Sequence, residues 1–376
     1  MASLGADWIG TGGTFLDYRT RWQERQRRRQ MMWLVSVPPV IVILVIVVLL
    51  TRLLSPHSPD WSYAGPEDNI AAPSIAGNQV VAAFSEGSVH CLRLLDGSEV
   101  WPEPFRRPER FVSGVGVAAG TAVMCSDYGM VYACSMVDGR GVWNVRLSGS
   151  TRAAPLLVDD IAYVVTEDGE IRGYRADTGE PVLTVDTDIA LSARPALHEG
   201  TLVAAGSDGV VIGIDATTGA ERWRRRLSAT FLCPVASIGG RIAIGSEQSR
   251  MYMFDPVDGR ITSQLPAYGL LRNPAVGDET GLYYSDSEGY LYCADADSGK
   301  IRYSLKLGRT INAGPFLRGQ NVYLVVDGTA LLEMDVTTRD VRRRWRLGGD
   351  ASRLSVGSGY AVVGTDSGRV AAVALD

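Results

Sequence analysis

From residue 58 onward, apolar residues run together or alternate over short stretches, and a turn residue separates each stretch from the next. Ile161 to Val165 and Val210 to Ile214 are two such stretches. Alternation or a short apolar run bounded by glycine is typical of a β-strand, and no segment after residue 58 shows a sustained period of 3.6. The pattern therefore predicts an all-β region built from many short strands.

The strand pattern returns at a nearly constant interval. One turn residue recurs at Gly87, Gly129, Gly169, Gly209, Ser249, Gly289, Gly328 and Gly368. The steps between these positions are 42, 40, 40, 40, 40, 39 and 40 residues. A second turn, in which Gly follows Asp, Thr or Ser, recurs at Gly97, Gly139, Gly179, Gly219, Gly259 and Gly299. A repeated unit of four strands is typical of a β-propeller, so the eight units predict eight four-stranded blades.

A large aromatic residue follows the second turn in several units. We expect the tryptophans of the repeats to pack between neighbouring blades at the periphery of the ring, because each buries about 150–250 Å². These structural residues are Trp61, Trp101, Trp143, Trp223 and Trp345, the last displaced by two positions from the repeat.

The last unit ends at Asp376, after its third strand, and therefore lacks an outermost strand. Trp61 lies 26 residues before Gly87, the interval that also separates Trp143 from Gly169. Residues 59–65 are therefore in register to supply the missing strand. An N-terminal strand that completes the C-terminal blade would close the ring and leave only short sheet edges.

A membrane-spanning helix is predicted over residues 31–54. Residues 31–51 contain no charged side chain, and the apolar stretch Trp33 to Leu54 is 22 residues long, enough to cross about 30 Å of hydrocarbon. Six arginines precede this span and one, Arg52, lies at its far end. The positive-inside rule then places residues 1–30 in the cytoplasm and residues 55–376 in the periplasm or extracellular space. A cleaved signal peptide is the alternative, but residues 55–59 offer no A-x-A cleavage site.

Charge and cysteine content restrict the function. Residues 60–376 carry 30 basic and 39 acidic residues, which argues against a general nucleic-acid binder. The five cysteines show no CxxC spacing, so no zinc site is predicted. Cys125 and Cys134 flank a predicted turn, and either form a cross-strand disulfide or are small core residues, which is the interpretation we favour.

The segment Asp215-Ala-Thr-Thr-Gly219-Ala-Glu-Arg-Trp223 resembles the repeat of pyrroloquinoline-quinone (PQQ)-type propellers. The resemblance extends over the whole propeller region and implies two very different functions. Some members of this family are quinone- and Ca²⁺-dependent dehydrogenases. Others are similar to the propeller lipoprotein of the outer-membrane β-barrel assembly machine, a scaffold without a cofactor.

The residues favour the scaffold. Resemblance to the dehydrogenases would imply a vicinal cysteine pair and a tryptophan that stacks beneath the quinone. In this sequence no two cysteines are adjacent, and the propeller tryptophans all lie at or near the outer-strand position. His90 and His198 are isolated in the sequence, and we expect them at the surface. We therefore predict no catalytic residue, cofactor or metal, and a membrane-anchored scaffold for an envelope complex such as the one for outer-membrane protein assembly. The alternative is a PQQ-dependent oxidoreductase or a degenerate quinone- or ligand-binding sensor.

A scaffold needs a binding surface, and the loops that enter the innermost strands line one mouth of the central channel. Polar and basic residues of these loops are predicted to bind a partner segment: Arg152, Arg194, Arg272, Asn273, Asn312 and Arg353. A polar channel mouth in any propeller is the plain alternative. Two arginine clusters, residues 222–226 and 342–346, fall on outermost strands, where they either bind anionic lipid or an acidic partner, or protect a sheet edge, which we favour.

Overall fold

The chain divides into two compact units, residues 1–56 and residues 57–376. The computed structural model describes residues 57–66, 71–111, 113–278, 281–296 and 298–375. Within these ranges no helix is long and apolar enough to cross a membrane. The predicted span, residues 31–54, and the predicted cytoplasmic tail lie outside them.

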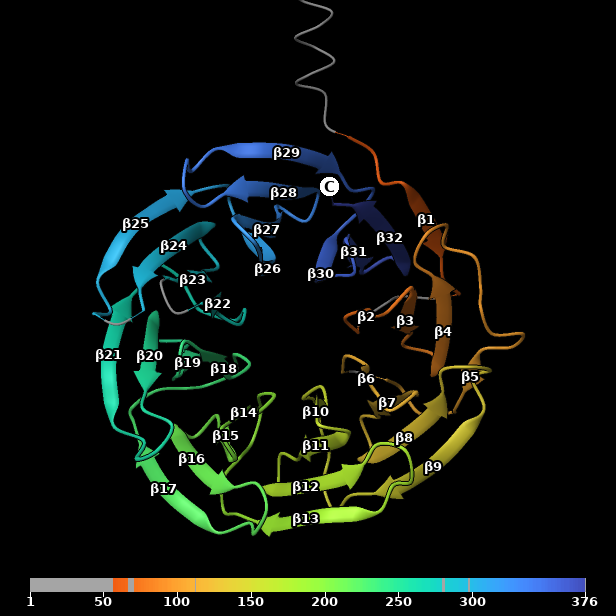
Figure 1. Cartoon of the computed structure of the whole chain (residues 1–376), viewed down its shortest axis with the longest axis horizontal. Coiled ribbons are helices and arrows are strands. Elements are labelled where there is room, and N and C mark those ends of the chain that lie inside the picture. Colours follow the sequence, from red (N-terminus) through yellow and green to blue (C-terminus); the bar gives the residue numbers. More distant parts are fainter. Residues whose placement is uncertain (1–56, 67–70, 112, 279–280, 297, 376) are drawn as a thin grey trace, which may run out of the picture. The chain divides into compact units, whose positions relative to one another are not determined.

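The second unit is a ring of eight four-stranded antiparallel sheets, which confirms the predicted fold of the propeller (Figure 1). Blades 1 to 4 consist of β2 (Ser74–Ala76), β3 (Gln79–Ala83), β4 (Ser88–Arg93) and β5 (Phe105–Arg106); β6 (Gly116–Ala118), β7 (Thr121–Cys125), β8 (Met130–Ser135) and β9 (Gly141–Arg146); β10 (Leu156–Val158), β11 (Ile161–Val165), β12 (Glu170–Arg175) and β13 (Pro181–Asp186); and β14 (Ala196–His198), β15 (Thr201–Ala205), β16 (Val210–Asp215) and β17 (Glu221–Arg226). Blades 5 to 7 consist of β18 (Ala236–Ile238), β19 (Arg241–Gly245), β20 (Arg250–Phe254) and β21 (Ile261–Pro266); β22 (Val276–Gly277), β23 (Gly281–Ser285), β24 (Tyr290–Asp295) and β25 (Ile301–Lys306); and β26 (Ile311–Arg318), β27 (Asn321–Val326), β28 (Ala330–Asp335) and β29 (Val341–Arg346).

Blade 8 is assembled from both ends of the unit. Its inner strands are β30 (Ala351–Gly357), β31 (Tyr360–Thr365) and β32 (Arg369–Ala374), and its outermost strand is β1 (Trp61–Ala64). β1 pairs antiparallel with β32, with Trp61 opposite Ala372 and Ala64 opposite Arg369. The ring is therefore closed by hydrogen bonds between segments about 300 residues apart in the chain.

Burial explains the difference between inner and outer strands. The second and third strands of each blade are covered on both faces by neighbouring blades, so every residue of β15 is buried, as are the first five of β16. A strand covered on both faces needs a continuous apolar run. The outermost strands alternate or expose most residues, as β9 does, because only one face meets the next blade.

Tryptophan contacts link neighbouring blades at the rim. The indole Nε1–H of Trp223 donates to the carbonyl oxygen of Pro256 in the next blade at 2.8 Å, and Trp143 donates in the same way to Ala176 at 2.8 Å. The face of Trp223 lies against Gly259, which has φ +68°. A glycine is required there because a Cβ would come within 2.3 Å of the indole. The recurrent glycine of the second turn thus serves both the turn and the contact between blades.

The other aromatic residues of the repeat make the same kind of contact, with one exception. Trp61, Trp101 and Tyr303 donate across a blade boundary to the carbonyl oxygens of Leu94, Met136 and Val336. Trp345, the displaced member, is buried and packs beside the ring of His57, with ring centroids 6.2 Å apart. All five tryptophans of the propeller therefore lie at or near the rim.

The cysteines are buried, free thiols. Cys125 pairs with Val131 and Cys134 pairs with Ala122, so the two cysteines belong to different positions of the β7–β8 ladder and to different core clusters. Of the two interpretations, the structure supports small core residues. Burial raises the pKa of Cys125 to about 12.

Candidate functional site: one mouth of the central channel

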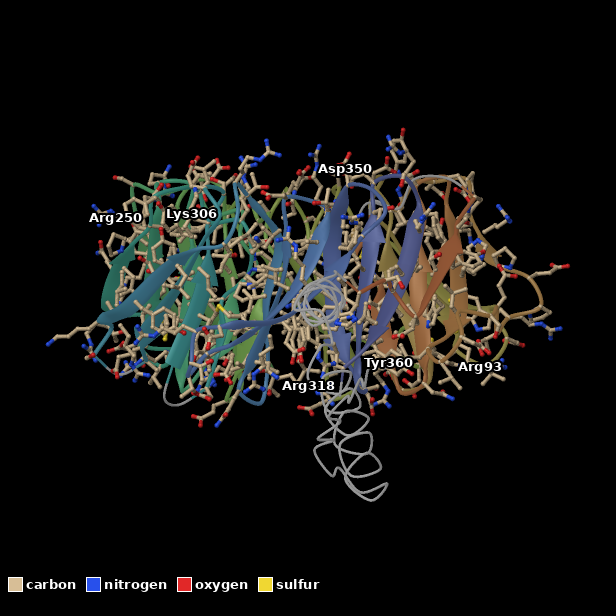
Figure 2. The ribbon with its side chains drawn as sticks, turned by 90° about the horizontal axis from the view of Figure 1, so that it is seen from above. Arg93, Arg250, Lys306, Arg318, Asp350 and Tyr360 are labelled. Carbon is tan, nitrogen blue, oxygen red and sulfur yellow. The ribbon has the colours of Figure 1, made fainter. Side chains whose placement is uncertain are left out.

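The antiparallel strand order places two kinds of connection at the same end of every blade. These are the loop that enters the innermost strand and the turn between the second and third strands. Figure 2 shows the two faces of the ring edge-on, with Arg250, Lys306 and Asp350 on one face and Arg93, Arg318 and Tyr360 on the other. Asp350 directly precedes β30, so its face carries the entry loops and the starts of the innermost strands, where the predicted partner-binding residues lie. We call this face the entry face.

Two of the predicted arginines are exposed and already paired. Arg152 Nε lies 3.2 Å from a carboxylate oxygen of Glu167, and Arg272 Nη2 lies 3.2 Å from one of Glu247. Their side chains are 78% and 63% exposed. Ion pairs this exposed contribute little to stability, and water and partner groups can exchange with them readily.

Arg194 differs from these arginines. It is half-buried, its Nε is enclosed, and no described residue accepts a hydrogen bond from its guanidinium or pairs with it. Burial lowers the pKa of Arg194 below the usual arginine value. A desolvated charge without a compensating anion is costly and marks a position that function can require.

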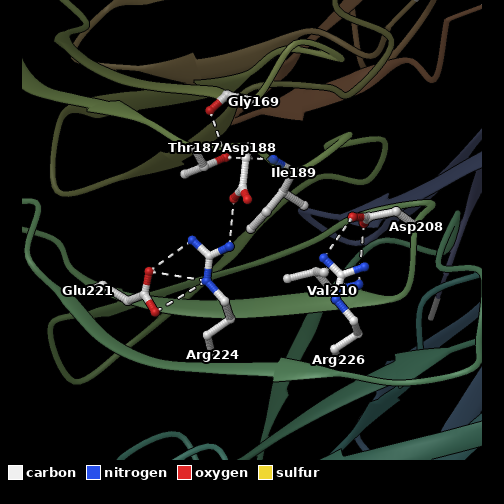
Figure 3. A network of polar contacts seen from close by, with 9 residues as sticks. All are labelled: Gly169, Thr187, Asp188, Ile189, Asp208, Val210, Glu221, Arg224 and Arg226. Atoms are coloured by element: carbon white, nitrogen blue, oxygen red, sulfur yellow. Dashed lines mark hydrogen bonds and ion pairs between the residues drawn. The ribbon is translucent and has the colours of Figure 1, made fainter.

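Two of the acids near Arg194 in the sequence, Asp188 and Asp208, lie against arginines of the outermost strand β17. Arg224 pairs with Asp188 at 2.6 Å and with Glu221 at 3.0 Å, and Arg226 approaches Asp208 to 3.9 Å (Figure 3). The hydrogen bond from Arg224 lowers the pKa of Asp188. Ser207 occupies the turn position at which blade 3 has Glu167, and Ser192 occupies the loop position of Arg152, so Arg194 lies two residues further along its loop than Arg152 does.

Of the remaining predicted residues, Asn273 lies in an entry loop, and Asn312 and Arg353 lie near the start of the innermost strands β26 and β30. Asn273 donates to the carbonyl oxygen of Ile311 at 3.3 Å, which links blades 6 and 7, and its own carbonyl accepts from the Cys233 thiol at 2.9 Å. The side-chain oxygen of Asn312 accepts from the Gly328 amide at 2.8 Å. Arg353 is half-buried and donates to the carbonyl oxygen of Ser352 at 3.0 Å. The two asparagines thus hold loops in place, and Arg194 has the guanidinium best suited to take an incoming anion.

The arginine clusters on the outer strands are largely engaged within the propeller. In β17, Arg222 pairs with Asp215 at 2.6 Å, and Arg225 donates to the carbonyl oxygens of Asp258 and Gly259 in the next blade. In β29, Arg342 pairs with Asp335, and Arg343 lies 3.5 Å from Glu333. These contacts neutralise much of the charge that a lipid surface or an acidic partner would need.

A polar network around His90 was missed by the sequence analysis. His90 is 6% exposed, so the expectation of a surface histidine is wrong. Its Nδ1 lies 3.0 Å from Glu99 and 3.0 Å from the Tyr63 hydroxyl, and its Nε2 lies 3.2 Å from Ser88 Oγ. The order Ser–His–Glu is that of a hydrolase triad, but Ser88 is completely buried and its hydroxyl bonds to Glu86. This network therefore serves the structure, and its signal in the sequence was the short spacing of Ser88, His90 and Glu99.

The residues present do not fit a quinone cofactor. All tryptophans after residue 56 take part in rim contacts, so none is available to stack beneath a quinone in the channel. Among the described residues, no group of three or more His, Cys, Asp or Glu side chains could hold a metal ion. We therefore derive no chemical step through a quinone or Ca²⁺.

The fold and the repeat define a closed eight-bladed β-propeller of the PQQ-like repeat class. The model of a protein family described as "Outer membrane protein assembly factor BamB" matches residues 85–231, 169–264 and 247–376. These matches cover most of the chain, which therefore belongs to this family. BamB from Moranella endobia is 22% identical over 314 residues, with 66% of this chain and 81% of the relative covered. The chain spans 43% of the length of BamB from Yersinia pestis, to which it is 25% identical over 170 residues.

Solved structures share the fold at low sequence identity. The crystal structure of BamB from Moraxella catarrhalis has a TM-score of 0.71 at 18% identity, with 84% of this chain and 98% of that chain covered. A quinohemoprotein alcohol dehydrogenase from Pseudomonas putida has a TM-score of 0.68 at 11% identity, with 85% and 76% covered. The propeller itself thus does not distinguish a scaffold from an enzyme.

Proposed function

We propose that this protein is a non-catalytic scaffold that binds envelope proteins through the entry face of its propeller. Residues 31–54 anchor it in the cytoplasmic membrane, with residues 1–30 in the cytoplasm and the propeller in the periplasm or extracellular space. Outer-membrane protein assembly is the process that its relatives' name suggests. Membership of the assembly-factor family is the observation that carries this proposal.

Arg194 gives the binding surface its chemistry. Its guanidinium is partly desolvated and has no acid, whereas Arg152 and Arg272 on the same face each have one. A carboxylate from an extended partner segment would supply the missing anion, and a charge-assisted hydrogen bond in such a site is strong and directional. Arg272 and Arg353 would then contact the partner around it.

Affinity purification of the tagged full-length protein from gently solubilised membranes, with quantitative mass spectrometry, tests the proposal. We expect one or more envelope proteins to co-purify in near-stoichiometric amounts. The combined substitution of Arg194, Arg272 and Arg353 by Gln should reduce that capture at least about tenfold, the effect of losing about 1.4 kcal/mol of binding energy. Arg140→Gln is the matched control, because Arg140 is 88% exposed and lies in the β8–β9 turn at the opposite end of the blade.

Two results would contradict the proposal in different ways. Unchanged capture by the triple variant would show that the binding surface lies outside the entry face, and the scaffold function would remain. Recovery of the protein alone, even after cross-linking, would contradict the scaffold function itself.

The fold shared with a quinohemoprotein alcohol dehydrogenase keeps an oxidoreductase, or a degenerate quinone-binding sensor, as the second proposal. Titration of the purified protein with pyrroloquinoline quinone, with and without Ca²⁺, separates the two. A scaffold shows no saturable Ca²⁺-dependent binding, and an oxidoreductase or sensor does.

A further inference from the structure

Residues 57–64, here called the closing segment, contact three blades in succession. His57 lies beside the outer edge of blade 7, where its amide donates to Arg344 and its carbonyl accepts from Arg346, each at 2.8 Å. Trp61 to Ala64 form β1 on the edge of blade 8, outside β32 (Figure 1). The side chains of β1 then reach blade 1. In every other blade, the outermost strand belongs to the continuous chain of that blade.

At the rim, the contact between blades 8 and 1 is made by this segment. Its rim contact is Trp61, whose indole lies against Gly97 and donates to the carbonyl oxygen of Leu94 at 2.8 Å. Beside it, the Tyr63 hydroxyl donates to Glu99 at 2.6 Å and lies 3.0 Å from His90 Nδ1. The hydrogen bond from Tyr63 lowers the pKa of Glu99, so the ionised carboxylate is the form that the contact favours.

The closing segment is also weakly buried. Trp61 and Tyr63 are only partly buried, and Ser62 and Ala64 are exposed, whereas the last five residues of β31 are fully enclosed. A short terminal strand with few buried side chains is the kind of element that opens locally at a lower free energy than the whole domain. A partly buried polar network contributes only while all of its members are in place.

We propose that residues 57–64 open and close as one unit, held by the Tyr63–His90–Glu99 network, while the other blades stay folded. Closure of the ring at its rim is then a local equilibrium of the segment that leads directly to the first 56 residues of the chain, whereas a buried core cluster joins blades 8 and 1 further inside. When the segment opens, the edge of β32 becomes exposed to solvent and blade 8 separates from blade 1 at the rim.

Amide hydrogen exchange of the full-length protein tests this proposal. We expect residues 57–64 to exchange faster than β30 and β31. Tyr63→Phe should accelerate the exchange of residues 57–64 about fivefold, the effect of one net hydrogen bond, and leave β30 and β31 unchanged. Tyr303→Phe is the matched control, because it removes a hydroxyl that bridges blades 6 and 7, and it should leave the closing segment unchanged.

Any other pattern overturns the proposal. Equal exchange in the closing segment and in β30 and β31 means that blade 8 opens only when the ring unfolds. A common acceleration of all three by Tyr63→Phe has the same meaning. If Tyr63→Phe does not accelerate the exchange of residues 57–64, the Tyr63–His90–Glu99 network does not hold the segment. If Tyr303→Phe accelerates the exchange of residues 57–64, weakening any blade boundary opens the segment.

Discussion

The contact between Trp223 and Gly259 gives the sharpest prediction for stability. In Gly259→Ala, the new Cβ would lie 2.3 Å from Trp223 Cε3. Carbon atoms in van der Waals contact are about 3.5–4.0 Å apart, so the indole or the turn must move by more than about 1 Å. Overpacking of this kind costs about 1–3 kcal/mol. The left-handed backbone, φ +68°, adds about 1–2 kcal/mol for a residue with a Cβ.

Gly240→Ala separates these two contributions. Gly240 lies in the same blade with φ +73°, and a Cβ there would have no atom within 4 Å. Both substitutions carry the same backbone cost and the same reduction of unfolded-state entropy. Gly259→Ala should therefore reduce the free energy of unfolding by about 1–3 kcal/mol more than Gly240→Ala does.

Urea denaturation of the purified full-length variants, followed by tryptophan fluorescence and circular dichroism, measures this difference. Trp223→Ala alone should cost about 3–5 kcal/mol, because Trp223 is 5% exposed. Combined with Gly259→Ala, it should lose less than the sum of the single effects, because the clash has gone. Equal losses for the two glycine variants, or additive losses in the double variant, would refute the steric explanation of the glycine repeat.

Two further predictions concern charge and protonation. Arg194→Gln should raise the free energy of unfolding by about 1 kcal/mol, because it removes a desolvated charge without an anion. Arg272→Gln breaks an exposed ion pair and should change the free energy of unfolding by less than about 0.5 kcal/mol. Urea midpoints compare the two variants, and destabilisation by Arg194→Gln would show that the charge of Arg194 is compensated. Burial raises the pKa of Cys125 to about 12, whereas the pKa of an unfolded thiol is about 8.5. Between these pH values the folded state therefore holds a proton that the unfolded state has lost. The free energy of unfolding should therefore fall as pH rises through this window, and it should fall less in Cys125→Ala. If both proteins lose the same free energy of unfolding between pH about 8 and about 10.5, this thiol is not a cause of the loss.

The candidate site could be located from the sequence, but its members could not be ranked. The repeat places Arg152, Arg194 and Arg272 in entry loops, because that position depends only on strand order. Which arginine lacks an anion depends on side chains from other turns and strands. Asp208, for example, is near Arg194 in the sequence but approaches Arg226 in the structure.

The number of blades, their four strands and their glycine turns could be predicted from the sequence alone. These features repeat locally about every 40 residues, because each blade must solve the same packing problem with its neighbours. The register of Trp61 also predicted which strand closes the ring, and only the folded chain shows which side chains the closing segment contacts. His90 and Glu99 contact Tyr63, and Trp345 packs beside His57, and no other blade has these contacts because only this outer strand comes from the other end of the propeller. A contact that occurs only once in the molecule leaves no period in the sequence, so only the folded chain reveals it.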